Sequence, residues 1–166
     1  AVEIANTMVF IGSKLENKIP PEDLYTLGLF HDAGIPAMAC KYPDYVDVLK
    51  EANDSMRHTL VKYEERKYPT NHAIVGFYLA NSWHLPKNLC RIILNHHEMD
   101  FFSRRQLISE HPKLAVLKLA ENIVFHNKRM HSIPEWDEYK DTILGVLLLD
   151  DDELEDMIED LSVAEF

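Results

Sequence analysis

The chain has 166 residues, of which 46% are apolar and 27% are charged, and its formal net charge is −11. This length suits one domain with a substantial core. No apolar run approaches the roughly 18 residues of a membrane span, and no signal-peptide pattern opens the chain, so no membrane segment is expected. The two cysteines give no disulfide framework, which favours a reducing, cytoplasmic location.

The negative charge is concentrated near the C-terminal end. Residues 1–134 carry 15 acidic and 16 basic side chains, whereas residues 135–166 carry 13 acidic side chains and one basic side chain. The nearly neutral body lacks the basic surface that general nucleic-acid binding needs, so nucleic acid is not an expected partner. A local pocket for a small anionic ligand is compatible with this charge.

Proline and turn residues divide the chain into helix-length segments, and no clear strand alternation is present. The chain starts with Ala1 inside a helix-like pattern, which predicts that the N-terminal part of the domain is truncated. The stretch AGIPAMACKYP interrupts the helical pattern. Thr70 or Asn71 is expected to cap the helix that follows. The expected helices are residues 1–17, 21–31, 44–66, 72–83, 85–97, 112–125 and 151–161.

The acidic segment DDDELEDMIEDLS is best interpreted as an amphipathic helix. Its apolar residues Leu154, Met157, Ile158 and Leu161 follow the i, i+3, i+4, i+7 rule, which leaves a solvated acidic face. A calcium-binding loop is excluded, because the central glycine and the ligand spacing are missing. The sequence as a whole predicts an all-α, single-domain helical bundle over residues 1–166.

Polar side chains interrupt four apolar helical stripes. Each one alone is most simply a hydrogen-bonded core residue or an ion-paired acid. Together they suggest one shared partner, because a buried carboxylate needs a cation or strong donors. Imidazoles combined with carboxylates are typical ligands of Fe, Mn, Zn or Ni. The residues on the stripes are His31, His72, His96 and Glu121, and Asp32 and His97 are immediate neighbours of two of them.

Two stretches resemble a known family. GLFHDAG, residues 28–34, resembles the HDIG signature of the HD superfamily of metal-dependent phosphohydrolases. Residues 71–98 resemble the H-x-x-x-G…W-x-L-P…HH pattern of its HDOD (HD-related output domain) branch. The resemblance implies a right-handed helical bundle with the ligands at its centre. It also implies a bacterial signalling role beside receiver or diguanylate-cyclase modules. The metal-ligating set that it implies is His31, Asp32, His72, His96, His97 and Glu121.

This ligand set departs from that of active superfamily members. No histidine precedes His31, although active members have another His ligand about one helix upstream. Ile35 replaces the lysine that often follows the signature and helps to hold the substrate phosphate. Glu121 stands where an aspartate is usual, and its longer side chain would shift a metal ion.

Three hypotheses follow from this incomplete ligand set. The first is a catalytically inactive output domain that acts through protein contacts or small-ligand binding. The second is a metal-dependent phosphohydrolase or phosphodiesterase acting on a cyclic dinucleotide or nucleotide, in which Asp32 bridges two metal ions. The third is a helical scaffold with buried polar networks and no ligand. We expect the first.

Overall fold

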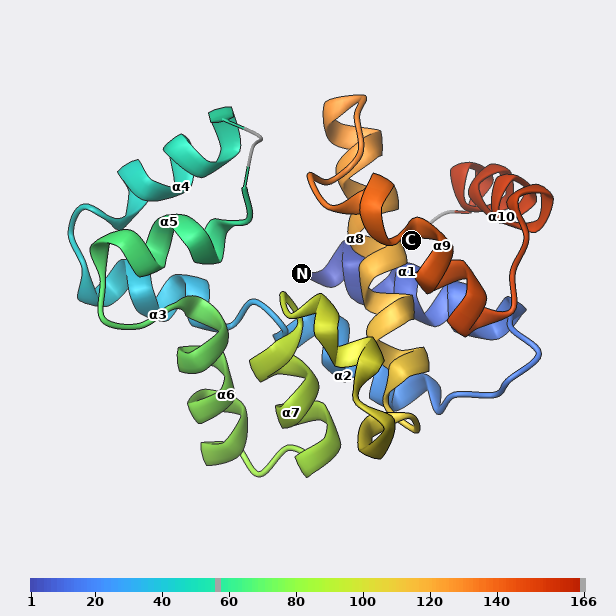
Figure 1. Ribbon diagram of the computed structural model, residues 1–166, viewed down its shortest axis with the longest axis horizontal. Coiled ribbons are helices and arrows are strands. Elements are labelled where there is room, and N and C mark those ends of the chain that lie inside the picture. Colours follow the sequence, from blue (N-terminus) through green and yellow to red (C-terminus); the bar gives the residue numbers. More distant parts are fainter. Residues whose placement is uncertain (56–57, 165–166) are drawn as a thin grey trace. The chain divides into compact units, whose positions relative to one another are not determined.

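A computed structural model describes residues 1–55 and 58–164 (Figure 1). All regular elements in these ranges are helices, so the predicted all-α fold is confirmed. The chain divides into two compact units. Unit 1 comprises Ala1–Leu29 and Asp100–Phe166, and unit 2 comprises Phe30–Met99. Among the described helices, none is both long enough and apolar enough to cross a membrane.

Unit 1 is organised around its longest helix, α8. Along α8, apolar residues such as Leu114 and Leu117 are fully buried. Helices α1 and α9 both pack against α8, and α10 packs against α1. The α-helices of this unit are α1 (Val2–Lys14), α2 (Pro21–Phe30), α8 (His111–Arg129), α9 (Trp136–Leu147) and α10 (Asp151–Val163). Its short 3-10 helices are η1 (Met99–Ser103) and η2 (Arg105–Leu107). The last residue of α2 and the first residue of η1 belong to unit 2.

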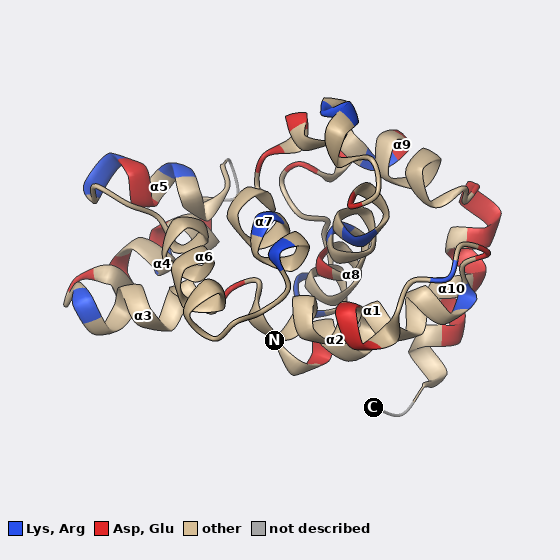
Figure 2. Ribbon diagram, turned by 90° about the horizontal axis from the view of Figure 1, so that it is seen from below, with Lys and Arg blue, Asp and Glu red and all other residues tan. Residues whose placement is uncertain are grey.

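Helix α10 begins with a capping box. The side chain of Asp150 accepts a hydrogen bond from the Glu153 backbone N–H at 2.8 Å, and the Glu153 side chain accepts one from the Asp150 N–H at 2.9 Å. The helix buries Leu154 and its apolar neighbours, while its acidic residues line the outer surface (Figure 2). The predicted amphipathic helix is therefore confirmed, except that Ile158 is exposed.

Unit 2 contains five helices within the described residues. Helix α6 packs against α3, α5 and α7, and α4 packs against α5. Met38 on α3, Tyr45 on α4 and Tyr63 on α5 belong to one buried cluster, which forms a core between these helices. The five helices are α3 (Gly34–Lys41), α4 (Tyr45–Ser55), α5 (Leu60–Lys67), α6 (His72–Ser82) and α7 (Lys87–Asn95).

The expected helices differ from the observed ones in several places. The stretch AGIPAMACKYP contains α3 rather than a break, because Pro36 lies in the first helical turn, where a missing N–H breaks no hydrogen bond. The single helix expected over residues 44–66 is two helices, since α4 ends at Ser55 and α5 begins at Leu60. Helix α9 was not expected at all.

Candidate metal centre

The histidines and the aspartate of the sequence motifs lie at the ends of helices. His31 and Asp32 lie in the turn between α2 and α3, where Ala33 N–H donates to the Phe30 carbonyl at 3.0 Å. The helix expected to include His31 therefore ends one residue earlier. His96 and His97 likewise follow the last residue of α7 instead of continuing the helix.

His72 is the first residue of α6, and its backbone position is fixed by a cap. The side-chain oxygen of Asn71 accepts a hydrogen bond from the Ile74 N–H at 3.0 Å. Its Nδ2 donates to Oε1 of Glu65 at 2.9 Å, which ties the cap to α5. The sequence left Thr70 and Asn71 as alternatives, and Asn71 is the cap.

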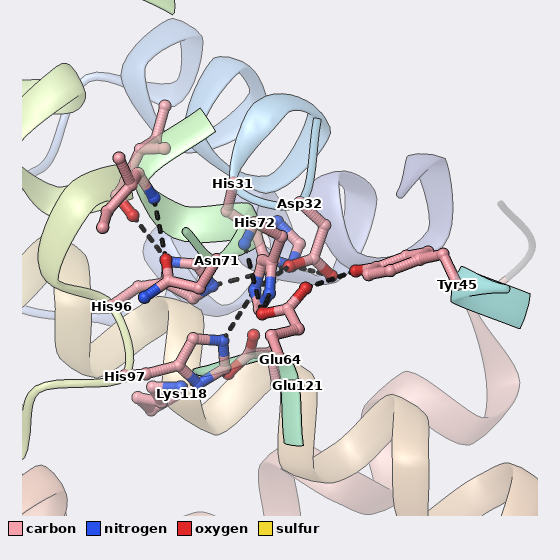
Figure 3. A network of polar contacts seen from close by, with 12 residues as sticks. His31, Asp32, Tyr45, Glu64, Asn71, His72, His96, His97, Lys118 and Glu121 are labelled. Carbon is pink, nitrogen blue, oxygen red and sulfur yellow. Dashed lines mark hydrogen bonds and ion pairs between the residues drawn. The ribbon is translucent and has the colours of Figure 1, made fainter. Parts of the chain in front are cut away.

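Four side chains of unit 2 converge on one point (Figure 3). Asp32, His72, His96 and His97 each offer one ligand atom, and these four atoms lie within 4.8 Å of one another. Nε2 of His72 is 3.0 Å from Nε2 of His97. Oδ1 of Asp32 is 3.5 Å from Nε2 of His72 and 3.4 Å from Nε2 of His96. The expected convergence of these four residues is therefore present.

His31 borders the same carboxylate from its other oxygen. Its Nε2 is 3.0 Å from Oδ2 of Asp32, and its ring meets the His96 ring edge-on at a centroid distance of 5.6 Å. His31, His72 and His96 are buried, whereas 37% of the Asp32 side chain is exposed. His31, His72 and His96 thus form the buried side of the cluster, and Asp32 and the partly buried His97 form its more accessible side.

The surrounding imidazoles keep Asp32 ionised. Burial alone would raise the pKa of this carboxyl, but the charge and hydrogen bond of His31, the hydrogen bond of His96 and the charge of His72 lower the pKa well below its ordinary value. The cluster therefore presents an anionic oxygen among nitrogen ligands.

Two imidazoles are oriented by hydrogen bonds at Nδ1. Nδ1–H of His72 donates to Oε2 of Glu64 at 2.8 Å, and Nδ1–H of His96 donates to the Ile93 carbonyl at 2.7 Å. In a neutral ring this leaves Nε2 as a lone-pair acceptor. Both Nε2 atoms face Oδ1 of Asp32, which is also an acceptor. A proton or a metal ion among these atoms would relieve their repulsion.

Three of the separations among the four ligand atoms match those around a transition-metal ion. Zinc bonds to histidine and carboxylate ligands are about 2.0–2.2 Å long, which gives separations between adjacent ligands of about 2.8–3.6 Å in octahedral or tetrahedral geometry. The three separations around Asp32 and His72 are 3.0, 3.4 and 3.5 Å. The mixture of imidazole and carboxylate suits Zn, Fe, Mn or Ni better than Ca or Mg.

Helical periodicity did not identify Glu64, which hydrogen-bonds to His72, or Tyr45, which hydrogen-bonds to Glu64. Oε1 of Glu64 accepts a hydrogen bond from the Tyr45 hydroxyl. Glu64 is fully buried and follows Val61 by three residues on α5. The rule that identified Glu121, a polar residue on an apolar stripe, would have identified Glu64 had α5 been treated as a separate helix.

Glu121, the remaining predicted ligand, lies in unit 1 on α8. Its Oε2 accepts a hydrogen bond from Nζ of Lys118 at 2.8 Å, and Lys118 is buried. Glu121 thus has the other role that the sequence left open, which is pairing with a lysine. Its role as a ligand stays a prediction.

Comparison with known proteins identifies the family. A family model described as the HDOD domain matches residues 1–99, which is more than half of the chain. No curated protein and no solved structure matches significantly. The matched residues include His31, Asp32, His72, His96 and His97, so the converging cluster lies within the family segment. The chain therefore belongs to the HDOD domain family.

Proposed function

We propose that this protein is a non-catalytic signalling output domain whose cluster holds one divalent transition-metal ion. The ligands are Asp32, His72, His96 and His97, and His31 orients Asp32. The observation that carries the proposal is the convergence of two Nδ1-anchored imidazoles, His72 and His96, on one ionised carboxylate oxygen.

A bound ion would serve folding and signalling rather than hydrolysis. It would join the α2–α3 turn, the start of α6 and the end of α7. Its positive charge would act on the Asp32 carboxylate together with the surrounding donors. A binuclear hydrolytic centre needs a carboxylate bridge and further ligands for a second ion. Within unit 2, both oxygens of Glu64 already accept hydrogen bonds from Tyr45 and His72, so Glu64 is not a second carboxylate ligand.

The output itself would be a protein contact. In this proposal, the partners are signalling proteins with receiver or diguanylate-cyclase modules, as the family resemblance implies. Occupancy of the metal site would change the stability of the surface formed by the helices that the ligands join.

A metal-dependent phosphohydrolase is the second candidate, and one observation favours it. Asp32 is 37% exposed whereas His31, His72 and His96 are buried, so the cluster is accessible from its carboxylate side. In that case Asp32 would bridge two metal ions, and the bound metal would activate water and neutralise phosphate charge. Ile35, where the superfamily often has lysine, leaves that phosphate contact unfilled.

One experiment separates the two functions. Protein prepared without chelators or affinity-tag nickel is analysed for metal, loaded with Mn²⁺, Fe²⁺ or Zn²⁺, and assayed with cyclic dinucleotides and an aryl phosphate. We expect one metal ion per chain and turnover far below about one per second. Enzyme-like turnover that is lost in Asp32→Ala would overturn the non-catalytic proposal, and a wild-type protein without metal would overturn the metal site.

A further inference from the structure

Glu64 is a buried carboxylate that is not a ligand in the proposed metal site. It lies on α5 and is completely inaccessible to solvent. Tyr45 and Tyr63 belong to the adjoining hydrophobic core. An ionised carboxylate in such surroundings is destabilising unless strong donors compensate it.

Three donors compensate the Glu64 carboxylate, and two of them belong to His72. Oε2 accepts hydrogen bonds from the His72 backbone N–H at 3.1 Å and from His72 Nδ1–H at 2.8 Å. Oε1 accepts from the Tyr45 hydroxyl on α4. Hydrogen-bond donors therefore hold the carboxylate at both oxygens and stabilise its charged form.

We infer that Glu64 is the positioning residue of the metal centre and that Tyr45 secures it. Glu64 accepts a hydrogen bond from His72 Nδ1–H. This leaves His72 Nε2 with the lone pair, which faces Asp32 and His97 (Figure 3). The bond to the backbone N–H of the same residue fixes the ring relative to the first turn of α6. This inference rests on the proposed function, since it assigns the orientation of one ligand.

The negative charge of Glu64 has a chemical role in addition to the shape of the side chain. A carboxylate that accepts a hydrogen bond from Nδ1–H makes the opposite ring nitrogen a better electron donor. Loss of such a hydrogen-bond partner typically lowers metal affinity by about 10- to 100-fold. Glutamine keeps the size and one acceptor oxygen but removes the charge. A positioning role is therefore sensitive to Glu64→Gln even when the fold survives.

The test compares Glu64→Gln with Glu51→Gln, the same substitution at an exposed position on α4. Affinity for Zn²⁺ is measured by competition with a chromogenic chelator, and the visible spectrum of the Co²⁺ form reports ligand geometry. Circular dichroism of the metal-free variants checks the fold. For Glu64→Gln we expect a loss of Zn²⁺ affinity of about 10- to 100-fold and an altered Co²⁺ spectrum. For Glu51→Gln we expect near wild-type values.

Tyr45→Phe provides a second variant in case Glu64→Gln does not fold. It removes only the hydroxyl donor at Oε1, and a few-fold weaker Zn²⁺ affinity is expected. Nitrogen-15 NMR of the metal-free wild-type protein adds a readout that needs no metal, with the proton of neutral His72 expected on Nδ1.

The outcomes distinguish this inference from the proposed function. Wild-type protein that binds one ion while Glu64→Gln and Tyr45→Phe bind it equally tightly would overturn the positioning role alone. A proton found on Nε2 of neutral His72 would do the same. Wild-type protein that binds no metal would overturn both.

Discussion

Gly34 lies so close to His72 that a Cβ atom on Gly34 would be 1.9 Å from the His72 carbonyl oxygen. The same atom would be 2.8 Å from the backbone nitrogen of Gly76. Only glycine allows the start of α3 to meet the first turn of α6 at this distance. Because Asp32 lies two residues before α3, this contact between two backbones keeps Asp32 near His72.

Gly34→Ala is expected to destabilise the protein by at least about 1–3 kcal/mol, because the obstructing atoms are backbone and cannot rotate away. Urea denaturation measures the change in the free energy of unfolding. Gly145→Ala on α9 is the matched control, since a Cβ there meets nothing within 4 Å. The control should be neutral or more stable by up to about 1 kcal/mol. Equal effects of the two substitutions would contradict the close-contact explanation.

Asp32→Ala and His72→Ala are each expected to reduce bound metal to background, because each removes a ligand from a set of four. Elemental analysis of purified protein gives the metal content per chain. His126→Ala, which removes an exposed imidazole on α8, is the control and should keep the wild-type content. Unchanged metal content in the first two variants would place the ion elsewhere.

Metal binding is expected to stabilise the folded state. Zn²⁺ at about 100 times its dissociation constant should add about 2.7 kcal/mol to the free energy of unfolding, provided that the unfolded chain does not bind it. Urea denaturation with Zn²⁺ and with excess chelator measures the difference. The gain should vanish in Asp32→Ala. A gain that persists in this variant would indicate binding at another site.

Glu121→Ala is expected to lower the stability of the fold by about 3 kcal/mol, because it leaves the Lys118 ammonium buried without its partner. Thermal or urea unfolding measures the loss, and Asp156→Ala on exposed α10 is the control. The proposed ligands all come from unit 2, so metal content should be unchanged. Loss of metal in Glu121→Ala would instead assign Glu121 to the ligand set, as the sequence predicted.

The sequence predicted the helical class and four converging side chains because both depend on local patterns. Helical periodicity identified His31, His72 and His96 as polar residues on apolar stripes, and Asp32 and His97 are the chain neighbours of His31 and His96. It could not show that the ligands lie at helix ends. The helix limits depend on the turn at residues 31–33 and on the end of α7 at Asn95, and both leave the apolar period unbroken.

Glu64 and Tyr45 were missed for a different reason. Their bond connects α4 with α5, two segments that periodicity alone joins into one helix. In one continuous helix, residues 19 positions apart would lie far apart along the axis, so no contact between them is expected. Because α4 and α5 pack against each other, the Tyr45 hydroxyl lies against the Glu64 carboxylate. Long-range contacts of this kind cannot be inferred from spacing along the sequence.

The position of every proposed ligand at a helix terminus links metal occupancy to local backbone opening. Terminal turns open more readily than helix interiors, and opening at His72 or His96 would remove a ligand. An ion that binds only the closed form must therefore slow amide hydrogen exchange at three separate termini together. The centre would in this way convert a change in metal concentration into coordinated rigidity of segments that are distant in the sequence.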